Sequence, residues 1–197
     1  AFELIELAKN AGADAAKFQH YTADSLVSDI GFKSLSSSKS HQSEWKKSVY
    51  DTYEDASLNK EWTRKLKNKC DELGLAFMTS PYSVSLVDYV DEYLSVYKIG
   101  SGDITWIEII EHISKKLKPT ILATGASNIE DVKRAVNHFF KFNKDLILMQ
   151  CNTNYTLDKS NFSYINLNVL KEYKKLFPNV ILGLSDHTQG HSTVLGA

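Results

Sequence analysis

The chain has 197 residues, a hydrophobic content of 43% and a formal net charge of -1 at pH 7. A chain of this length can bury a core, which favours one domain or most of one. The nearly neutral charge gives no electrostatic basis for binding nucleic acid or a membrane surface. The apolar runs have the length of strands, far short of the roughly 20 residues of a membrane span.

The two cysteines, Cys70 and Cys151, are isolated in the sequence. They form neither a C-x-x-C pair nor a metal-ligand spacing, so we expect two reduced thiols. No signal-peptide pattern is present, which predicts a cytoplasmic protein. The chain starts at Ala1 inside a helical pattern and stops at Ala197 in mid-pattern, so we expect a fragment of a longer protein.

Hydrophobic periodicity and Gly or Pro punctuation divide the first half of the chain into helices and strands around a long connection over 20–57. In chain order we expect a helix Phe2–Ala11 ended by Gly12, a strand Ala13–Gln19, a helix His41–Tyr53 inside the connection, a helix Asn59–Leu73 capped by Asn59 and ended by Gly74, a strand Leu75–Ser80 stopped by Pro81, and a helix Ser83–Tyr93.

Strands and helices alternate regularly in the second half. We expect a strand Val96–Gly100, a helix Ile107–Leu117, a strand Thr120–Thr124, a helix that Ser127 caps with Glu130 in a capping box and that runs to Phe142, a strand Leu146–Cys151, a helix Asn166–Leu176, and a strand Val180–Ser185.

Almost all six strands are apolar on both faces, which is typical of a parallel sheet covered by helices. The segment Gly100-Ser101-Gly102 lacks the third glycine of the Gly-x-Gly-x-x-Gly sequence that marks a dinucleotide fold. We therefore predict an α/β fold, an incomplete (β/α)8 TIM barrel, in preference to a doubly wound sheet.

Polar side chains follow the carboxyl end of every predicted strand, and in a barrel these ends converge. They are Lys17 and Gln19; Thr79 and Ser80; Lys98, Ser101 and Asp103; Thr124; Asn152, Thr153 and Tyr155; and Ser185, Asp186 and His187. Two lysines and several hydroxyl donors make an anion pocket, which suits a small substrate such as a phosphorylated carboxylate.

Single residues of this set remain open to more than one interpretation. Lys17 either reaches solvent from a strand edge or points at an anionic ligand. His187 is a metal ligand, a general base or a satisfied core histidine, and its neighbours Ser185 and Asp186 favour a functional role. His20 and His41 are expected to be ordinary surface residues.

Five segments resemble the catalytic barrel of the sialic acid synthase family, which includes N-acetylneuraminate synthase and its legionaminate and pseudaminate synthase relatives. They follow the family's order and spacing over essentially the whole chain. The segments are AGADAAKFQ at 11–19, TSPY at 79–82, YKIGSGD at 97–103, ILATG at 121–125 and GLSDHT at 183–188.

The resemblance implies a metal-dependent condensation of phosphoenolpyruvate with an N-acetylated hexosamine such as N-acetylmannosamine, giving a nonulosonic acid and phosphate. It implies Mn or Mg as the cofactor, with His187 as a metal ligand. It assigns catalytic roles to Lys17, Lys98, Asp103 and His187, and substrate-binding roles to Gln19, Ser80, Ser101, Thr124, Thr153, Tyr155, Ser185 and Asp186.

The resemblance also implies a longer native protein. Residues 1–197 match a partial synthase barrel domain without the family's first and last strands, the second metal histidine and the C-terminal antifreeze-like domain. That domain lends an arginine to the partner's active site, so we expect a homodimer of the full-length protein and no turnover by the isolated fragment. Ala123, Asp103 and the segment 150–155 depart from the family pattern, which leaves the sugar undetermined.

Two other functions remain open. A Schiff-base aldolase would use Lys98 or Lys17 as its nucleophile. A barrel-derived module that binds anions without turnover would need no nucleophile and no metal.

Overall fold

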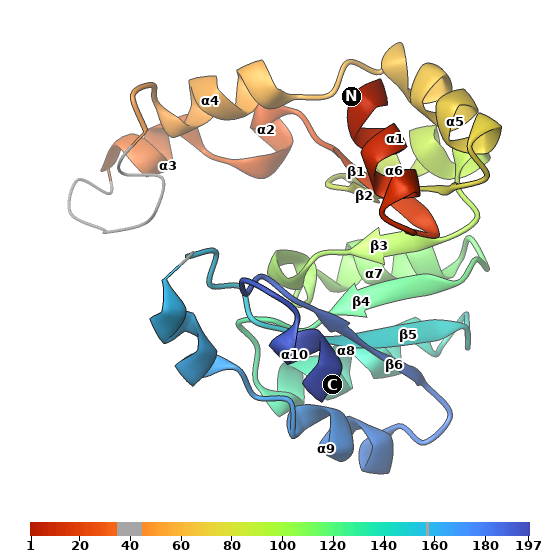
Figure 1. Cartoon of the computed structure of the whole chain (residues 1–197), viewed down its shortest axis with the longest axis vertical. Helices are drawn as coiled ribbons and strands as arrows, with labels where there is room; N and C mark the ends of the chain where they lie inside the picture. The colour runs from red at the N-terminus through yellow and green to blue at the C-terminus, as the bar shows by residue number, and fades with distance from the viewer. Residues whose placement is uncertain (35–44, 157) are drawn as a thin grey trace. The chain divides into compact units, whose positions relative to one another are not determined.

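The computed structural model describes residues 1–34, 45–156 and 158–197. The chain divides into two compact units, Ala1–Leu94 and Ser95–Ala197, and each is described by itself. Figure 1 gives the element labels.

The first unit contains a pair of parallel strands, in register from Ala15 opposite Ala76 to His20 opposite Pro81. Its core is apolar and includes Leu66, Phe77 and Val87, each at most 2% exposed. The elements are α1 (Phe2–Asn10), β1 (Ala15–His20), α2 (Ala23–Leu26), α3 (Asp29–Ser34), α4 (Val49–Ala56), α5 (Trp62–Glu72), β2 (Ala76–Pro81), α6 (Val84–Val90) and η2 (Asp91–Tyr93).

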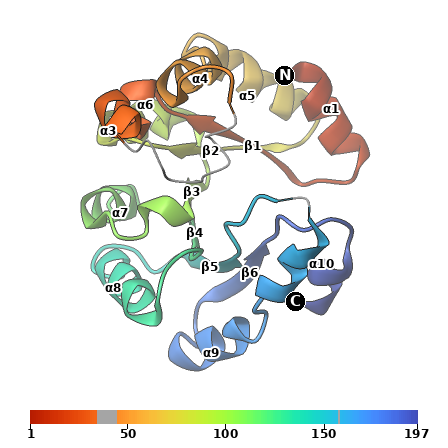
Figure 2. The same ribbon diagram turned by 90° about the vertical axis from the view of Figure 1, so that its left-hand side faces the viewer.

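The second unit contains four parallel strands that pair in chain order. Figure 2 shows α7, α8 and α9 together on one side of these strands. The elements are β3 (Tyr97–Ile99), η3 (Ser101–Asp103), α7 (Ile107–Ser114), β4 (Thr120–Ala123), α8 (Ile129–Phe139), β5 (Leu146–Cys151), η4 (Lys159–Tyr164), α9 (Val169–Leu176), β6 (Ile181–Ser185) and α10 (Ser192–Gly196).

Side chains alternate between the two faces of the second unit's sheet, because successive residues of a strand point in opposite directions. Tyr97, Leu122 and Leu148 face the helices and are fully buried. Lys98 and Ser185 lie on the opposite side, where Lys98 pairs in register with Ile121 of the next strand. The helix-facing side therefore forms the core, and the opposite side carries the polar residues predicted for the site.

Several predicted helix starts are wrong by a few residues. Asn59 does not cap α5; its side chain accepts a hydrogen bond from the Glu61 amide at 2.9 Å, and the helix begins at Trp62. The cap of α8 is Asn128, with Asp131 completing the capping box, in place of the predicted pair one residue earlier. The first residues of the predicted helix His41–Tyr53 lie outside the described residues, and α4 begins at Val49.

The predicted end of α7 is also wrong, for a backbone reason. The helix stops at Ser114, and Leu117 has a φ of +56°, which is not helical. An L-residue reaches this left-handed region only at a steric cost, and the exposed Leu117 does not extend the buried face of the helix.

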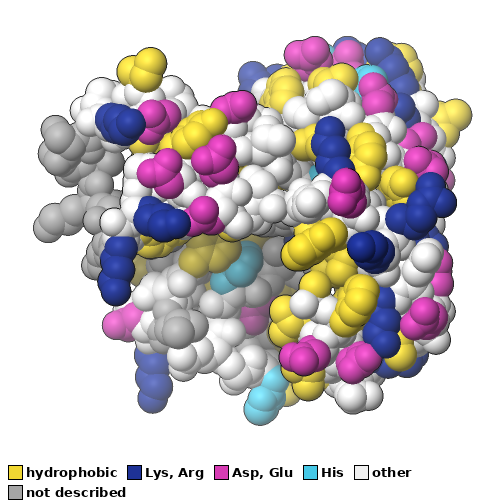
Figure 3. Space-filling model, turned by 90° about the horizontal axis from the view of Figure 1, so that it is seen from above, with side chains coloured by type: hydrophobic (Ala, Val, Ile, Leu, Met, Phe, Trp, Pro, Cys, Tyr) yellow, Lys and Arg dark blue, Asp and Glu magenta, His cyan; other side chains and the backbone are white. Residues whose placement is uncertain are grey.

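Charged side chains of both signs are mixed over the face shown in Figure 3, in keeping with the near-zero net charge. Over the described ranges, no helix is both long and apolar enough to cross a bilayer.

Candidate functional site

His187 follows β6 and is oriented by a single hydrogen bond. Its Nδ1 lies 2.8 Å from the backbone carbonyl oxygen of Asn152, at the end of β5. A carbonyl oxygen only accepts, so Nδ1 carries the proton and the Nε2 lone pair remains for a ligand. The Tyr155 ring packs edge-on against the imidazole, with ring centroids 4.6 Å apart. His187 is therefore held in the tautomer and orientation that a metal ligand or base requires.

The loop after β5 owes its shape to Asn161, which is 1% exposed. The Asn161 side chain accepts a hydrogen bond from the Asn152 amide group at 2.8 Å and donates one to the Asn154 carbonyl at 3.0 Å. These bonds hold the segment that carries Tyr155 and the carbonyl acceptor of His187. Nothing in the sequence pattern pointed to Asn161, because its partners are residues of its own loop.

Ser101 and Gly125 lie in close contact at the ends of β3 and β4. The Gly125 amide donates a hydrogen bond to the Ser101 hydroxyl oxygen at 2.9 Å. A Cβ on Gly125 would lie 2.4 Å from the Thr153 methyl carbon and 2.9 Å from the same hydroxyl oxygen. Glycine is therefore required here, and it lets Ser101 and Thr153 approach each other with the Ser101 O–H left to donate.

Lys98 and Asp103 are two ionisable residues in and just after β3. Lys98 is 8% exposed, and its ammonium donates to the Ile99 carbonyl at 2.9 Å. Burial raises the pKa of Asp103 to about 6, and the positive charge of Lys98 opposes that shift. A carboxyl group with a pKa near neutrality can both donate and accept a proton at physiological pH.

Asp186 has a local structural partner. Its carboxylate accepts hydrogen bonds from the Thr188 amide at 3.1 Å and from the Thr188 hydroxyl at 2.9 Å. The Thr188 and Thr193 hydroxyls are 2.8 Å apart, which links this turn to the start of α10. Asp186 thus shapes the turn that contains His187, while Ser185 is half-buried at the end of β6.

Thr124 is not brought together with Lys98 and Ser185. Its hydroxyl donates to the Met149 carbonyl at 3.0 Å and accepts from the Tyr173 hydroxyl of α9 at 2.8 Å. These partners place the Thr124 side chain on the helix-facing side of the sheet. Its role in binding substrate remains a prediction.

In the first unit, Lys17, Gln19 and Ser80 share one face of the strand pair. Gln19 is in register with Ser80, and paired residues of parallel strands point to the same side. The Gln19 amide donates to the Tyr82 hydroxyl at 2.9 Å. More than a third of the Lys17 residue surface is exposed, yet burial of the group lowers the pKa of the Lys17 ammonium. The roles of these three residues in binding substrate remain predictions.

His20 is buried, so the prediction of a surface histidine is wrong. Its two ring nitrogens each lie 2.8 Å from a threonine hydroxyl, Nδ1 from Thr79 and Nε2 from Thr63. Burial, with a smaller contribution from the positive charge of Lys60, lowers the pKa of His20 to about 4. The strand alternation puts His20 on the face opposite Lys17, where it serves the core.

His187 fits the role of a metal ligand but does not make a complete metal site. Its Nε2 lone pair and its backbone-anchored Nδ1 are the usual arrangement of a ligating histidine. Within residues 1–34, 45–156 and 158–197, no three His, Cys, Asp or Glu side chains gather closely enough to hold a metal ion.

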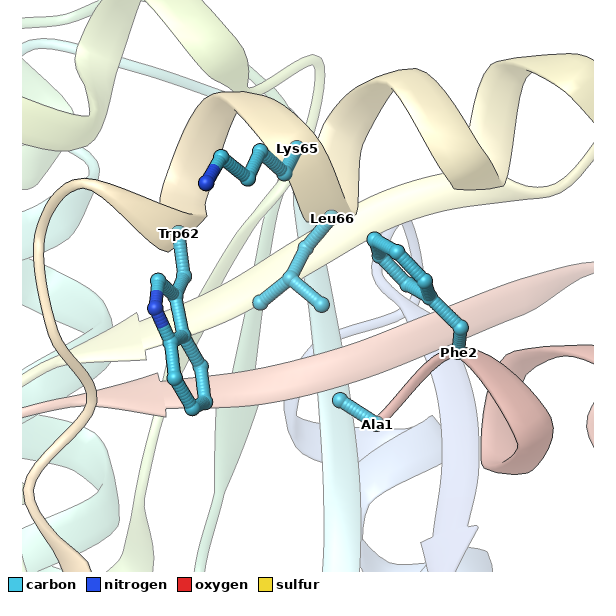
Figure 4. A pocket seen from close by; sticks show the side chains of 5 residues that line it. All are labelled: Ala1, Phe2, Trp62, Lys65 and Leu66. Carbon is cyan, nitrogen blue, oxygen red and sulfur yellow. The ribbon is translucent and has the colours of Figure 1, made fainter.

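A pocket of about 290 Å³ lies between α1 and α5 of the first unit. Figure 4 shows Phe2, Trp62 and Leu66 around it, with Lys65 as the charged residue among the labelled side chains. This lining offers apolar contact and little chemistry, and the residues predicted for the site lie elsewhere.

The sequence profile of the NeuB family matches residues 4–197. The chain belongs to the NeuB family. It is 28% identical to the human N-acetylneuraminate-9-phosphate synthase, covering 95% of this chain and 51% of that protein. It is 32% identical to a pseudaminic acid synthase of Campylobacter jejuni, with 96% and 54% covered. This NeuB-family chain thus spans about half the length of the curated relatives it matches.

The fold agrees with the family. The crystal structure of a sialic acid synthetase from Leptospira borgpetersenii, in complex with citrate, superimposes with a TM-score of 0.80 at 23% identity, covering 97% of this chain and 60% of that one. The family resemblance seen in the sequence and the predicted α/β, barrel-type fold are both confirmed.

Proposed function

We propose that the protein is a nonulosonic acid synthase, which condenses phosphoenolpyruvate with an N-acetylated hexosamine to give a nonulosonic acid and phosphate. The observation that carries this proposal is His187, whose Nδ1 is bound to the Asn152 carbonyl and whose Nε2 is left for a metal. The NeuB-family match over 4–197 supports the reaction class.

A divalent metal ion, Mn or Mg, would polarise the aldehyde of the open-chain sugar when bound at His187. Lys98, Ser101 and Ser185 are proposed to bind the phosphate or carboxylate of phosphoenolpyruvate, because an ammonium and hydroxyl donors favour an anion. Lys17 and Ser80 of the first unit are proposed as anion-binding residues as well. The hydrogen bond from Gly125 turns the Ser101 O–H outward as a donor.

The sugar would be bound by Gln19, Tyr155 and Thr153, with Asp103 moving a proton. The pKa of about 6 at Asp103 allows its carboxyl to exchange a proton near neutral pH. Asp186 keeps the turn around His187 in place through Thr188. The relatives carry different sugar names, so N-acetylmannosamine is one member of the proposed substrate class.

We also propose that residues 1–197 are part of one synthase barrel domain in a cytoplasmic homodimer. For the 197-residue chain alone we expect no turnover, because the described residues supply one candidate metal ligand and no three-ligand cluster.

The experiment measures phosphate release by the native-length protein from phosphoenolpyruvate and N-acetylmannosamine, with and without MnCl2. We expect release that a chelator stops and that Mn or Mg restores. Release that a chelator leaves unchanged would overturn the metal role, and no release with any N-acetylated hexosamine would overturn the reaction.

A Schiff-base aldolase remains the second candidate, since burial lowers the pKa of Lys17 and so favours the neutral amine that attacks carbonyls. Borohydride with a carbonyl substrate would trap Lys17 or Lys98 as a covalent adduct in an aldolase. The synthase would give no adduct.

A further inference from the structure

A second pocket of about 520 Å³ lies in the second unit, between the ends of β4 and β5, the start of α8, and α9. Its volume falls in the range of about 300–1,000 Å³ typical of small-molecule sites. None of the described residues that line it carries a charge. The lining consists mainly of hydroxyl and carboxamide side chains, among them Ser127, Asn128, Gln150, Tyr164, Asn166 and Tyr173.

Gln150 supplies the observation that points to a ligand. The residue lines this pocket and is 6% exposed, and its Oε1 has no hydrogen-bond partner. Leaving a buried acceptor unsatisfied destabilises the fold. The last side-chain torsion of glutamine is soft, so a small rotation can turn the amide toward a bound group. A ligand hydroxyl in the pocket would satisfy this oxygen.

The start of α8 favours a neutral ligand over an anion. The Asn128 side chain already accepts hydrogen bonds from the Glu130 and Asp131 amides, at 2.9 and 3.0 Å. These amides are the donors that would otherwise bind a phosphate at a helix start. The lining in turn offers many weak donors and acceptors, which suit a molecule with several hydroxyl groups.

Two tyrosines complete the lining. Tyr173 is 4% exposed and donates to Thr124, so it forms part of the fixed wall. Tyr164 is 68% exposed and offers an apolar ring with a polar edge. An exposed aromatic ring beside hydroxyl and amide groups can cover the apolar face of a sugar while its edge stays wet.

The part of this pocket at Gln150 lies on the other face of the sheet from Lys98 and Ser185, whereas Thr124 and Thr153, which are among the predicted substrate-binding residues, also line it. Gln150 pairs in register with Leu184, whereas Cys151 pairs with Ser185. Successive side chains of a strand point to opposite faces. Gln150 therefore faces the helices, as Thr124 does through its bond to Tyr173. The pocket therefore shares Thr124 and Thr153 with the predicted substrate-binding residues, but its Gln150 side chain faces away from Ser185.

We propose that the pocket behind β4 and β5 is an accessory binding site for a neutral monosaccharide, with Gln150 as an acceptor for a sugar hydroxyl and Tyr164 as a stacking surface.

The test follows the side-chain amide of Gln150 by two-dimensional NMR of the whole chain during titration with D-glucose, N-acetyl-D-glucosamine and inorganic phosphate. We expect saturable shifts with at least one sugar and none with phosphate. The variant N166W fills the exposed mouth of the pocket and should weaken the binding at least tenfold. N168W is the matched control, because Asn168 is exposed on the same segment and does not line the pocket.

A second variant, Q150L, removes the unsatisfied oxygen. We expect the affinity for the sugar to fall at least tenfold. The thermal midpoint of unfolding should rise, because leucine has no buried oxygen that needs a hydrogen bond. H187A should leave this binding unchanged, which separates it from the proposed reaction. The proposal is overturned if neither sugar shifts the Gln150 amide, if phosphate alone does, or if N166W and N168W bind sugar equally.

Discussion

Two histidines stand at strand ends in this protein, and their surroundings differ. His20, at the end of β1, is 1% exposed, and both of its nitrogens are hydrogen-bonded to threonine hydroxyls. His187, after β6, is half-buried, and its hydrogen bond to the Asn152 carbonyl occupies Nδ1. A histidine with two internal partners stabilises the core, and one with a single backbone partner can bind something else.

The face of the strand on which a side chain lies determines whether it packs in the core or belongs to the proposed site. His20 shares the helix-facing side of its strand with Thr79, whereas Lys17 points the other way. The same division separates Thr124 from Lys98 in the second unit. His20 and Thr124 on the helix-facing side are hydrogen-bonded to neighbouring hydroxyl groups, and the opposite side carries Lys17 and Lys98, which are proposed for the reaction.

Replacing His187 gives the largest expected effect. H187A in the native-length protein should lower metal-dependent turnover about a thousandfold, because a Lewis acid supplies several kcal/mol of transition-state stabilisation. Circular dichroism should show an unchanged fold. H20A is the matched comparison and should destabilise the protein while leaving Mn2+ affinity intact. Equal metal affinity in H187A and the wild type would show that His187 is no more a metal ligand than His20.

Lowering the pH should reveal how much the neutral His20 contributes to the stability of the fold. Its folded pKa of about 4 lies below the ordinary histidine pKa of 6.5, so the unfolded chain binds more protons between these values. Its contribution to stability is present above pH 6.5 and is lost as the pH falls to about 4, for a total of about 3 kcal/mol. Urea unfolding at pH 7 and pH 4.5 measures this loss.

H20Q is the control for that measurement, since glutamine keeps hydrogen-bonding groups and does not titrate. Its stability should fall less than that of the wild type between the two pH values. The same pH dependence in both proteins would contradict a buried neutral His20.

Replacing Lys98 tests the role of the residues on the other face of the sheet. K98M should weaken phosphoenolpyruvate binding by roughly tenfold to a hundredfold, because a hydrogen bond to a charged group is worth about 1.5–3 kcal/mol. Sugar binding should change little, since the lost charge faces the anion. Calorimetric titration with each substrate measures the two affinities, and equal losses would show that Lys98 acts on the fold.

Asp103 gives the smallest expected effect, with a pH dependence opposite to that of His20. Its folded pKa of about 6 lies above the ordinary aspartate pKa of 3.8, so the folded chain binds more protons between these values. Stability from this group therefore falls as the pH rises from about 4 to about 6. D103N should be more stable at pH 8 by about 1–2 kcal/mol after allowance for partial exposure. Identical unfolding curves at pH 8 would show that Asp103 is not buried in its charged form.

The loops after the strands were the least predictable part of the chain. The structural roles of Asn161 and Gly125 could not be predicted because they depend on contacts. Asn161 bridges its own loop, and Gly125 leaves space for Thr153 and Ser101. The predicted cap at Ser127 was one residue early because Ser and Asn are both good caps, and the local geometry chose Asn128.

The sequence by itself determined the alternation of strands and helices, the polar residues at the strand ends and the family. Apolar periodicity, glycine and proline determine local structure, so the elements that they specify can be predicted from the sequence. Only the tertiary structure decided which face each side chain takes and which partners it meets. His20 and His187 are the same residue at similar strand ends, and what differs is the threonine pair around one and the Asn152 carbonyl beside the other.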